Sequence, residues 1–293
     1  MSSQLTDHMK GIYFDNETSF FSIHQVLNRD VTSTILQDLF RGNRRDIKIL
    51  DAFCGSGMRG LKNAMAIPNS TVLGIDVDRF SLSTAQRNST ALGLSRRVSW
   101  IERDIHVALR NFQCDKTLFD VIDIDPFGSS LPYLEDCIGC LRIGGILCLN
   151  FTDSSILFGG RRDELISYYR LEDNTAIASV CSHEYAIRLL VASIRAIVIK
   201  LGRSLEPLAC WGYGNGCRLI IKISEASNPV PGMLPRFASK SLMPVASCKE
   251  NNFVSAIDTD GKNLCICLEV SCRGQRYLCM YPKHSSTENS MSW

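Results

Sequence analysis

The strongest constraint on the fold is a repeated unit in which a short apolar segment precedes a helical pattern. Five such units follow one another, and their apolar segments are residues 47–50, 71–75, 98–102, 119–122 and 144–151. Strands that alternate with helices favour a doubly wound, mostly parallel sheet. We therefore predict an α/β, Rossmann-like fold. In such a sheet, ligands bind outside the carboxyl ends of the strands.

The fourth apolar segment stops abruptly at Asp125-Pro126-Phe127-Gly128. A strand that ends there presents a carboxylate, a carbonyl and an aromatic face at one point. Proline suits the middle position because it offers a carbonyl without an amide hydrogen. We predict that Asp125, Pro126 and Phe127 form the catalytic group and hold a flat ring that bears an amine.

The first apolar segment leads into Asp51 and then into a glycine turn with Gly55 and Gly57. A strand, a glycine turn and a helix let the backbone approach a ligand closely. The spacing through Gly60 also fits the dinucleotide pattern, so a nicotinamide cofactor remains an alternative. Asp51 favours a different cofactor, because an acidic residue before such a turn resembles the methionine-end site of S-adenosylmethionine enzymes.

Acidic residues also follow the next two segments. Asp76 ends the second segment, where a carboxylate can accept hydrogen bonds from both ribose hydroxyls of an adenosine cofactor. Asp78 competes for this role, and we prefer Asp76 because it lies at the strand end itself. Asp104 follows the third segment, where the site could bond an adenine edge. Asp104 is equally suited to cap the helix predicted at 106–112.

Polar residues and helical spacing predict the remaining elements. Asp30, Thr32 and Ser33 are expected to cap a helix over 31–40. Residues 152–182 are expected to be irregular, and 183–201 to form a long helix. Strands at 205–211 and 217–223 then close a seven-stranded sheet with an antiparallel edge hairpin. Beyond residue 224 we expect a linker and one strand pair, 252–257 with 263–270.

Composition limits the classes of function. The net charge of +2 gives no overall basic signature, so a nucleic-acid partner would have to be held by local patches. There is no secretory signal and no apolar run long enough to span a membrane. The 13 cysteines are therefore expected to be mostly free thiols in an intracellular, reducing compartment, with cytoplasm, nucleus and organelle all open. We expect a monomer.

Two groups of cysteines raise the question of a metal. A helix is expected over 131–141. Cys137 and Cys140 lie one turn apart on its apolar stripe, which favours buried core thiols. A C-terminal group has spacings unlike the usual paired zinc knuckles, so zinc is only a minor alternative there and no metal is otherwise expected. The members of that group are Cys265, Cys267, Cys272 and Cys279.

Several segments together resemble the tRNA (guanine-26) N2-dimethyltransferase family. They are LNRD at 27–30, DAFCGSGMRG at 51–60, GIDVDRF at 74–80, ERDI at 102–105, the stretch 119–153 around Asp-Pro-Phe-Gly, and CSHEYAIRLLVASI at 181–194. The resemblance covers residues 18–223. It implies a class I methyltransferase that transfers one or two methyl groups from S-adenosylmethionine to the 2-amino group of a tRNA guanine.

The resemblance also implies roles for individual residues. Arg29 and Arg59 would bind the methionine end of the cofactor, Asp76 the ribose, and Asp104 with the Ile105 backbone the adenine. Domain boundaries follow: 1–46 is an N-terminal approach segment, 47–224 the methyltransferase domain, and 225–293 a linker with a small or partly disordered C-terminal region. The family's Tyr-Gly unit is replaced by residues 174–180, and its large tRNA-binding domain is not recognisable after residue 224.

The chemistry of the catalytic group agrees with the resemblance. The exocyclic amine of guanine is a poor nucleophile, because its lone pair is delocalised into the ring. Asp125 and the Pro126 carbonyl could accept its two hydrogens while Phe127 stacks on a flipped-out base. Methylation of another RNA, of DNA or of a protein amine, and a non-catalytic RNA-binding paralogue, remain as alternatives. Cys54 is not expected to act as a nucleophile.

Overall fold

The structure is a computed structural model that describes residues 25–157, 162–169, 182–213, 216–226, 253–257, 263–272 and 275–281. For the last three ranges it describes the backbone only, so the side chains of the four C-terminal cysteines lie outside the described part of the chain. Residues 174–180 and the turn at 214–215 also lie outside the described part of the chain, as do the side chains of Cys181, His183 and Glu184.

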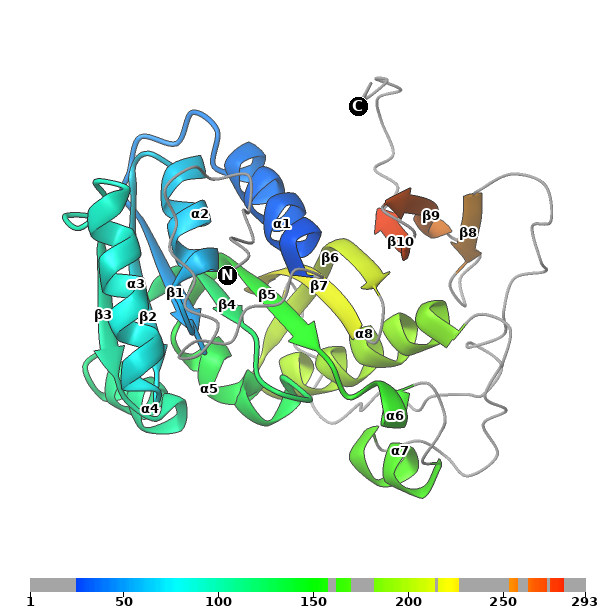
Figure 1. Cartoon of the computed structure of the whole chain (residues 1–293). Helices are drawn as coiled ribbons and strands as arrows, with labels where there is room; N and C mark the ends of the chain where they lie inside the picture. Colours follow the sequence, from blue (N-terminus) through cyan, green and yellow to red (C-terminus); the bar gives the residue numbers. More distant parts are fainter. Residues whose placement is uncertain are drawn as a thin grey trace.

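The described strands form one sheet in the order β3-β2-β1-β4-β5-β7-β6-β10-β9-β8 (Figure 1). Strands β1 to β5 pair in parallel, while β7 runs antiparallel between β5 and β6. These seven strands confirm the predicted fold. Their bounds are β1 Ile47–Ala52, β2 Ser70–Asp76, β3 Val98–Glu102, β4 Phe119–Ile124, β5 Leu141–Phe151, β6 Arg203–Tyr213 and β7 Gly216–Glu225.

Three C-terminal strands continue the sheet beyond the predicted hairpin. They are β8 Phe253–Ile257, β9 Asn263–Cys272 and β10 Gln275–Tyr281. The predicted pair β8 and β9 is present, and β10, which we did not predict, pairs antiparallel with β6. Strand β6 therefore has a partner on each side.

Helices cover both faces of the sheet (Figure 1). They are α1 Val26–Leu39, α2 Met58–Ala66, α3 Arg79–Ala91, α4 Ile105–Cys114, α5 Leu134–Gly139, α6 Ser154–Leu157, α7 Arg162–Tyr169 and α8 Ser182–Lys200, with a 3₁₀ turn at Leu131–Tyr133. Among the described residues, no helix is both long enough and apolar enough to span a membrane.

Two apolar cores lie on opposite faces of the sheet. On one face, Leu36 of α1 and Leu61 of α2 pack with Ile49 of β1. On the other, residues of α4, α5 and α8 pack against the strands, with Leu190 as an example. Because both faces are covered, every residue of β4 is buried, and a polar residue in such a strand needs a partner.

Helix α1 starts five residues earlier than we predicted. Its N-cap is Gln25, so Asp30, Thr32 and Ser33 lie inside the helix and do not cap it. Their polar groups make other contacts: the Ser33 hydroxyl donates to the Asp30 carbonyl, and Lys62 of α2 pairs with the Asp30 carboxylate. Tertiary contacts have overridden weak helix propensity here, and as a result Arg29 lies on a helix.

Two other predictions need correction. Residues 152–182 were expected to be irregular, but they contain α6 and α7. The helix expected over 131–141 begins as a 3₁₀ turn and ends at Gly139, and β5 starts at Leu141. Cys137 and Cys140 are fully buried in the core, as predicted.

Candidate active site

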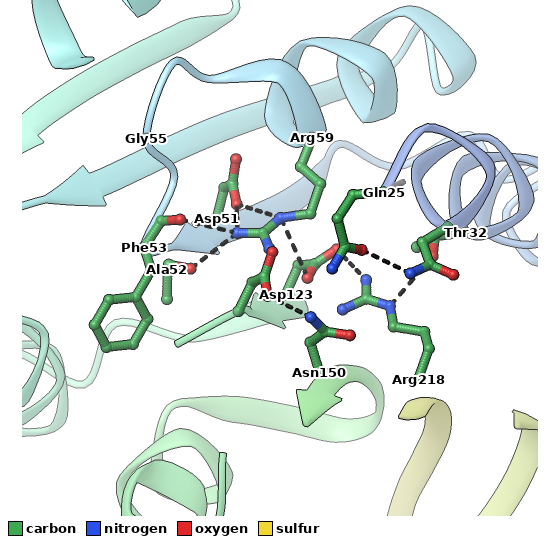
Figure 2. A network of polar contacts seen from close by, with 12 residues as sticks. Gln25, Thr32, Asp51, Ala52, Phe53, Gly55, Arg59, Asp123, Asn150 and Arg218 are labelled. Carbon is green, nitrogen blue, oxygen red and sulfur yellow. Dashed lines mark hydrogen bonds and ion pairs between the residues drawn. The ribbon is translucent and has the colours of Figure 1, made fainter. Parts of the chain in front are cut away.

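Polar side chains gather where β1, β4 and β5 end and β7 begins, with Arg59 at the centre (Figure 2). Arg59 comes from α2, the helix that follows the glycine turn. Its Nε and Nη2 donate to Asp51 Oδ1 at 2.9 and 2.5 Å, and Nη2 also donates to the carbonyls of Ala52 and Phe53 at 3.0 and 3.2 Å. The guanidinium therefore ties the start of α2 to the end of β1.

Asp51 is fully buried beneath this turn. Its second oxygen accepts the Gly60 amide at 2.8 Å. Burial raises the pKa of Asp51 to about 6, although the Arg59 charge and the Gly60 amide act in the opposite direction. Both oxygens are engaged within the protein, so Asp51 supports the turn from below.

Asp123 joins Arg59 to a second buried guanidinium, that of Arg218 on β7 (Figure 2). Arg218 Nη2 lies 2.7 Å from Asp123 Oδ2, and Arg59 Nε lies 3.5 Å from Asp123 Oδ1. Arg218 Nε also donates to the Thr32 hydroxyl of α1 at 3.3 Å. Burial alone lowers the pKa of Arg59, but the surrounding carboxylates, including Asp125, raise it well above its usual value.

Asp125 lies one residue past the end of β4, and its side chain is 31% exposed. Its Oδ2 is 2.6 Å from Arg59 Nη1. Its Oδ1 accepts the Asn150 amide of β5 at 2.5 Å. The carboxylate is therefore held from two sides and still reaches solvent. Next to it Pro126 is buried, and the Phe127 ring is 88% exposed.

Asp76, at the end of β2, holds the glycine turn from the other side. Its Oδ2 accepts the Gly55 amide at 2.8 Å, and its Oδ1 accepts the Asp78 amide at 3.0 Å. A carboxylate oxygen can accept more than one hydrogen bond, so Asp76 keeps acceptor capacity. Asp78 instead caps α3 by accepting from the amides of Phe80 and Ser81.

The remaining predicted site residues lie at the start of α4, on α1 and in the glycine turn. Asp104 caps α4 by accepting the Val107 amide at 3.1 Å, which confirms its structural role, and Ile105 is buried behind it. Arg29 is nearly buried on α1. Gly55 and Gly57 both have positive φ, as the turn requires.

A family model described as "N2,N2-dimethylguanosine tRNA methyltransferase" matches residues 2–273. The chain belongs to this family. The match extends beyond residue 224, where the resemblance we recognise in the sequence stops. It therefore includes strands β8 and β9 and ends before β10.

Curated relatives in the family carry the name tRNA (guanine(26)-N(2))-dimethyltransferase. The protein of Methanobrevibacter smithii is 29% identical over 208 residues, covering 71% of this chain and 52% of its own length. That of Methanococcus aeolicus is 33% identical over 198 residues, covering 64% of this chain and 50% of its own. The chain thus spans about half the length of these relatives.

A solved structure similar in fold is that of Trm1 from Pyrococcus horikoshii in complex with S-adenosyl-L-methionine. It has a TM-score of 0.62 and 19% identity, and covers 91% of this chain and 69% of its own. Pyrococcus horikoshii TYW2 has a TM-score of 0.51 and 15% identity, with coverage of 74% and 70%. Both likenesses concern the fold.

Several polar residues of the site were not predicted from the sequence. They are Gln25, Thr32, Asp123, Asn150, Tyr213 and Arg218. The signal that could have revealed three of them is a polar residue inside an otherwise apolar strand, because a buried polar group requires a partner. Asp123 in β4, Asn150 in β5 and Arg218 in β7 all have this character.

Other reactive or charged side chains are buried or paired outside the Arg59 cluster. Cys54 is buried, and burial first and the nearby carboxylates second raise the pKa of its thiol well above its usual value, so it is a poor nucleophile. Arg41 pairs with Asp38, and Arg45 with Asp120. Among the residues whose side chains are described, no group of His, Cys, Asp or Glu is arranged to hold a metal.

Proposed function

We propose that this chain transfers methyl groups from S-adenosylmethionine to the 2-amino group of a guanine in tRNA, giving N2-methyl- and N2,N2-dimethylguanosine. The observation that carries the proposal is the Asp125 carboxylate, held between Arg59 and Asn150 at the end of β4. A strongly exposed aromatic ring, that of Phe127, lies two residues further on. The names of the curated relatives support the choice of guanine and of tRNA.

The residues at the strand ends fit S-adenosylmethionine. Asp76 is partly exposed and has acceptor capacity for two ribose hydroxyls. A Cβ added at Gly55 would meet nothing within 4 Å, so the turn leaves room for a ligand beside it. We assign the methionine end to Arg29 and Arg59, and the adenine to Asp104 and the Ile105 backbone.

The proposed role of Asp51 is indirect. Its oxygens are engaged by Arg59 and Gly60, so Asp51 positions the glycine turn and Arg59 and is not required to touch the ligand. Gly55 and Gly57 shape the turn itself. In this assignment the cofactor-binding surface depends on the buried ion pair between Asp51 and Arg59.

S-adenosylmethionine, when bound, supplies a methyl group that is activated by the sulfonium. The chain then has to orient the amine, which it does with two acceptors, Asp125 and the Pro126 carbonyl. Correct orientation of reacting groups accounts for a large part of such rate enhancements. Asp125 accepts the proton that leaves the methylated nitrogen, and Phe127 stacks on the extruded base.

The proposed organisation of the chain follows from these residues. All of the assigned site residues except Arg29 lie within 47–224, which we propose as the methyltransferase domain. Residues 1–46 bring α1 and Arg29 to it. Residues 225–293 would form a C-terminal region whose strands β8 to β10 continue the same sheet beyond β6.

Mass analysis of nucleosides from tRNA incubated with the protein and S-adenosylmethionine tests the proposal. We expect N2-methylguanosine and N2,N2-dimethylguanosine. Asp125→Asn, which keeps the side-chain size, should lower kcat by at least about 100-fold while donor affinity stays within about threefold. Unmethylated guanosine in every tRNA, with methyl groups on another RNA or a protein instead, would contradict the substrate. A large loss of donor affinity in Asp125→Asn would contradict the role of Asp125.

A further inference from the structure

Five consecutive hydrogen bonds join helix α1 and strands β5 and β6 to the end of β4. From donor to acceptor, the six side chains are those of Trp211, Asn28, Gln25, Tyr213, Asn150 and Asp125. In the same order, the donor–acceptor distances are 2.6, 2.6, 2.9, 2.6 and 2.5 Å. Side chains up to 188 positions apart in the sequence thus form one continuous chain.

This hydrogen-bond chain has a single direction. The indole of Trp211 can only donate, and the ionised carboxylate of Asp125 can only accept. The three amides each accept with the oxygen and donate with the nitrogen, and the Tyr213 hydroxyl does both. The two ends therefore fix the orientation of every group between them. Aligned hydrogen bonds of this kind polarise and strengthen one another.

Four of the six side chains in the hydrogen-bond chain are shielded from water. Asn28, Asn150, Trp211 and Tyr213 are all buried. Burial first, and the Asp125 charge second, raise the pKa of Tyr213 far above its usual value. The hydroxyl therefore stays protonated and can donate to Asn150 throughout the working pH range.

We propose that this hydrogen-bond chain orients the Asp125 carboxylate for methyl transfer, which makes Asn150, Tyr213 and Gln25 positioning residues. The inference rests on the proposed function, in which Asp125 accepts from the amine. Asn150 engages one carboxylate oxygen and Arg59 the other, so the carboxylate cannot rotate without breaking a charge-assisted contact. Each oxygen keeps further acceptor capacity for the substrate.

Helix α1 gives the hydrogen-bond chain a second connection to the site. Gln25 is the N-cap of α1, and Arg29, which we assign to the donor, lies one turn further along the same helix. The position of α1 therefore bears on both substrates: directly on the donor through Arg29, and on the guanine through Gln25, Tyr213 and Asn150.

Tyr213→Phe removes one hydroxyl and breaks the hydrogen-bond chain in the middle. We expect kcat for tRNA methylation to fall about tenfold, with donor Kd and tRNA KM within about twofold of the wild type. The matched control is Tyr169→Phe. It also removes a buried tyrosine hydroxyl, one that donates to the Asp153 carboxylate at 2.6 Å. This control should leave kcat within about twofold.

A double-mutant cycle separates positioning from general structural damage. Asn150→Leu should lower kcat more than Tyr213→Phe, and the double variant should be no slower than Asn150→Leu alone, since Tyr213 acts only through Asn150. Additive losses would overturn the inference. Wild-type kcat in Tyr213→Phe would overturn it as well, even if Asn150→Leu failed to fold, and would leave the proposed function standing. A wild-type protein that methylates no tRNA guanine would overturn both.

Discussion

Asp76 and Asp78 are only two positions apart near the end of β2, but their carboxylates have different roles. Asp76 is held by two backbone amides and faces the glycine turn. Asp78 accepts from two amides and from the Ser81 hydroxyl at the start of α3, and the Ser81 hydroxyl is the main cause of its lowered pKa. One carboxylate is therefore available to a ligand, and the other is used by a helix.

The two residues should differ when each is replaced by alanine. Asp78→Ala should cost about 1 kcal/mol of unfolding free energy, the typical value of an N-cap, and leave donor affinity unchanged. Asp76→Ala should lower donor affinity by at least about tenfold, since two hydrogen bonds to a charged group are lost. Calorimetric titration with S-adenosylmethionine and urea unfolding measure the two quantities. Equal donor affinities in both variants would contradict the assignment of the ribose to Asp76.

Asp51 predicts a pH dependence of stability. Its pKa is raised from 3.8 to about 6 in the folded protein, so the native state binds this proton more tightly than the unfolded chain. The proton on Asp51 contributes on the order of 3 kcal/mol to the free energy of unfolding. This contribution is complete below about pH 4 and is lost as the pH rises through about 6.

Urea unfolding between pH 4 and 7 measures this contribution. Asp51→Asn has no proton to lose at this position and still can accept from Arg59. Its unfolding free energy should therefore fall less steeply with rising pH than that of the wild type. Identical slopes for the two proteins would show that Asp51 does not titrate in this window.

At the scale of elements, the glycine turn is shaped by what packs beneath it. Gly57, the N-cap of α2, has φ 79°. A Cβ there would lie 2.7 Å from the Trp100 ring and 2.9 Å from Ala85. Glycine is therefore required at position 57 for two reasons: the positive φ of the backbone and the close approach of β3 and α3.

Gly57→Ala should consequently lower the free energy of unfolding by more than an alanine that only has to adopt a positive φ. The matched control is Gly93→Ala, where φ is +68° and nothing lies within 4 Å of the added Cβ. We expect the control to lose about 1 kcal/mol and to bind the donor normally. Gly57→Ala should lose about 2–4 kcal/mol and bind the donor more weakly, because overpacking shifts the turn. Thermal unfolding and donor titration measure both, and equal losses would contradict the packing argument.

At the scale of the whole molecule, sheet topology brings the site together. Strands β1, β4, β5 and β7 are neighbours in the sheet, although Asp51 and Arg218 are far apart in the sequence. In the register of the sheet Asn150 lies opposite Arg218, and Asp51 lies beside Asp123. Four adjacent strands therefore deliver charged or amide groups to one edge, and α1 closes over them from one face.

Local patterns were sufficient for much of this protein. Alternating apolar and helical segments predicted the five parallel strands, because each segment carries its own periodicity. The glycine-rich link at 212–216 predicted the antiparallel hairpin. Asp76 and Asp125 could be singled out because a parallel sheet presents its strand ends on one side. Short-range signals failed where tertiary contacts compete: the start of α1 was misplaced because its polar residues contact the sheet and α2 and do not cap the helix.

The sequence by itself determined the type of sheet, the glycine turn and the acidic strand ends, since these depend on residues close together in the chain. Only the tertiary structure decided that Asp51 is engaged from within and that Asp125 is held on both oxygens. The same is true of the hydrogen-bond chain from Trp211 to Asp125. Hydrogen bonds between side chains more than 180 positions apart depend on which strands become neighbours and in what register, and no local pattern records that.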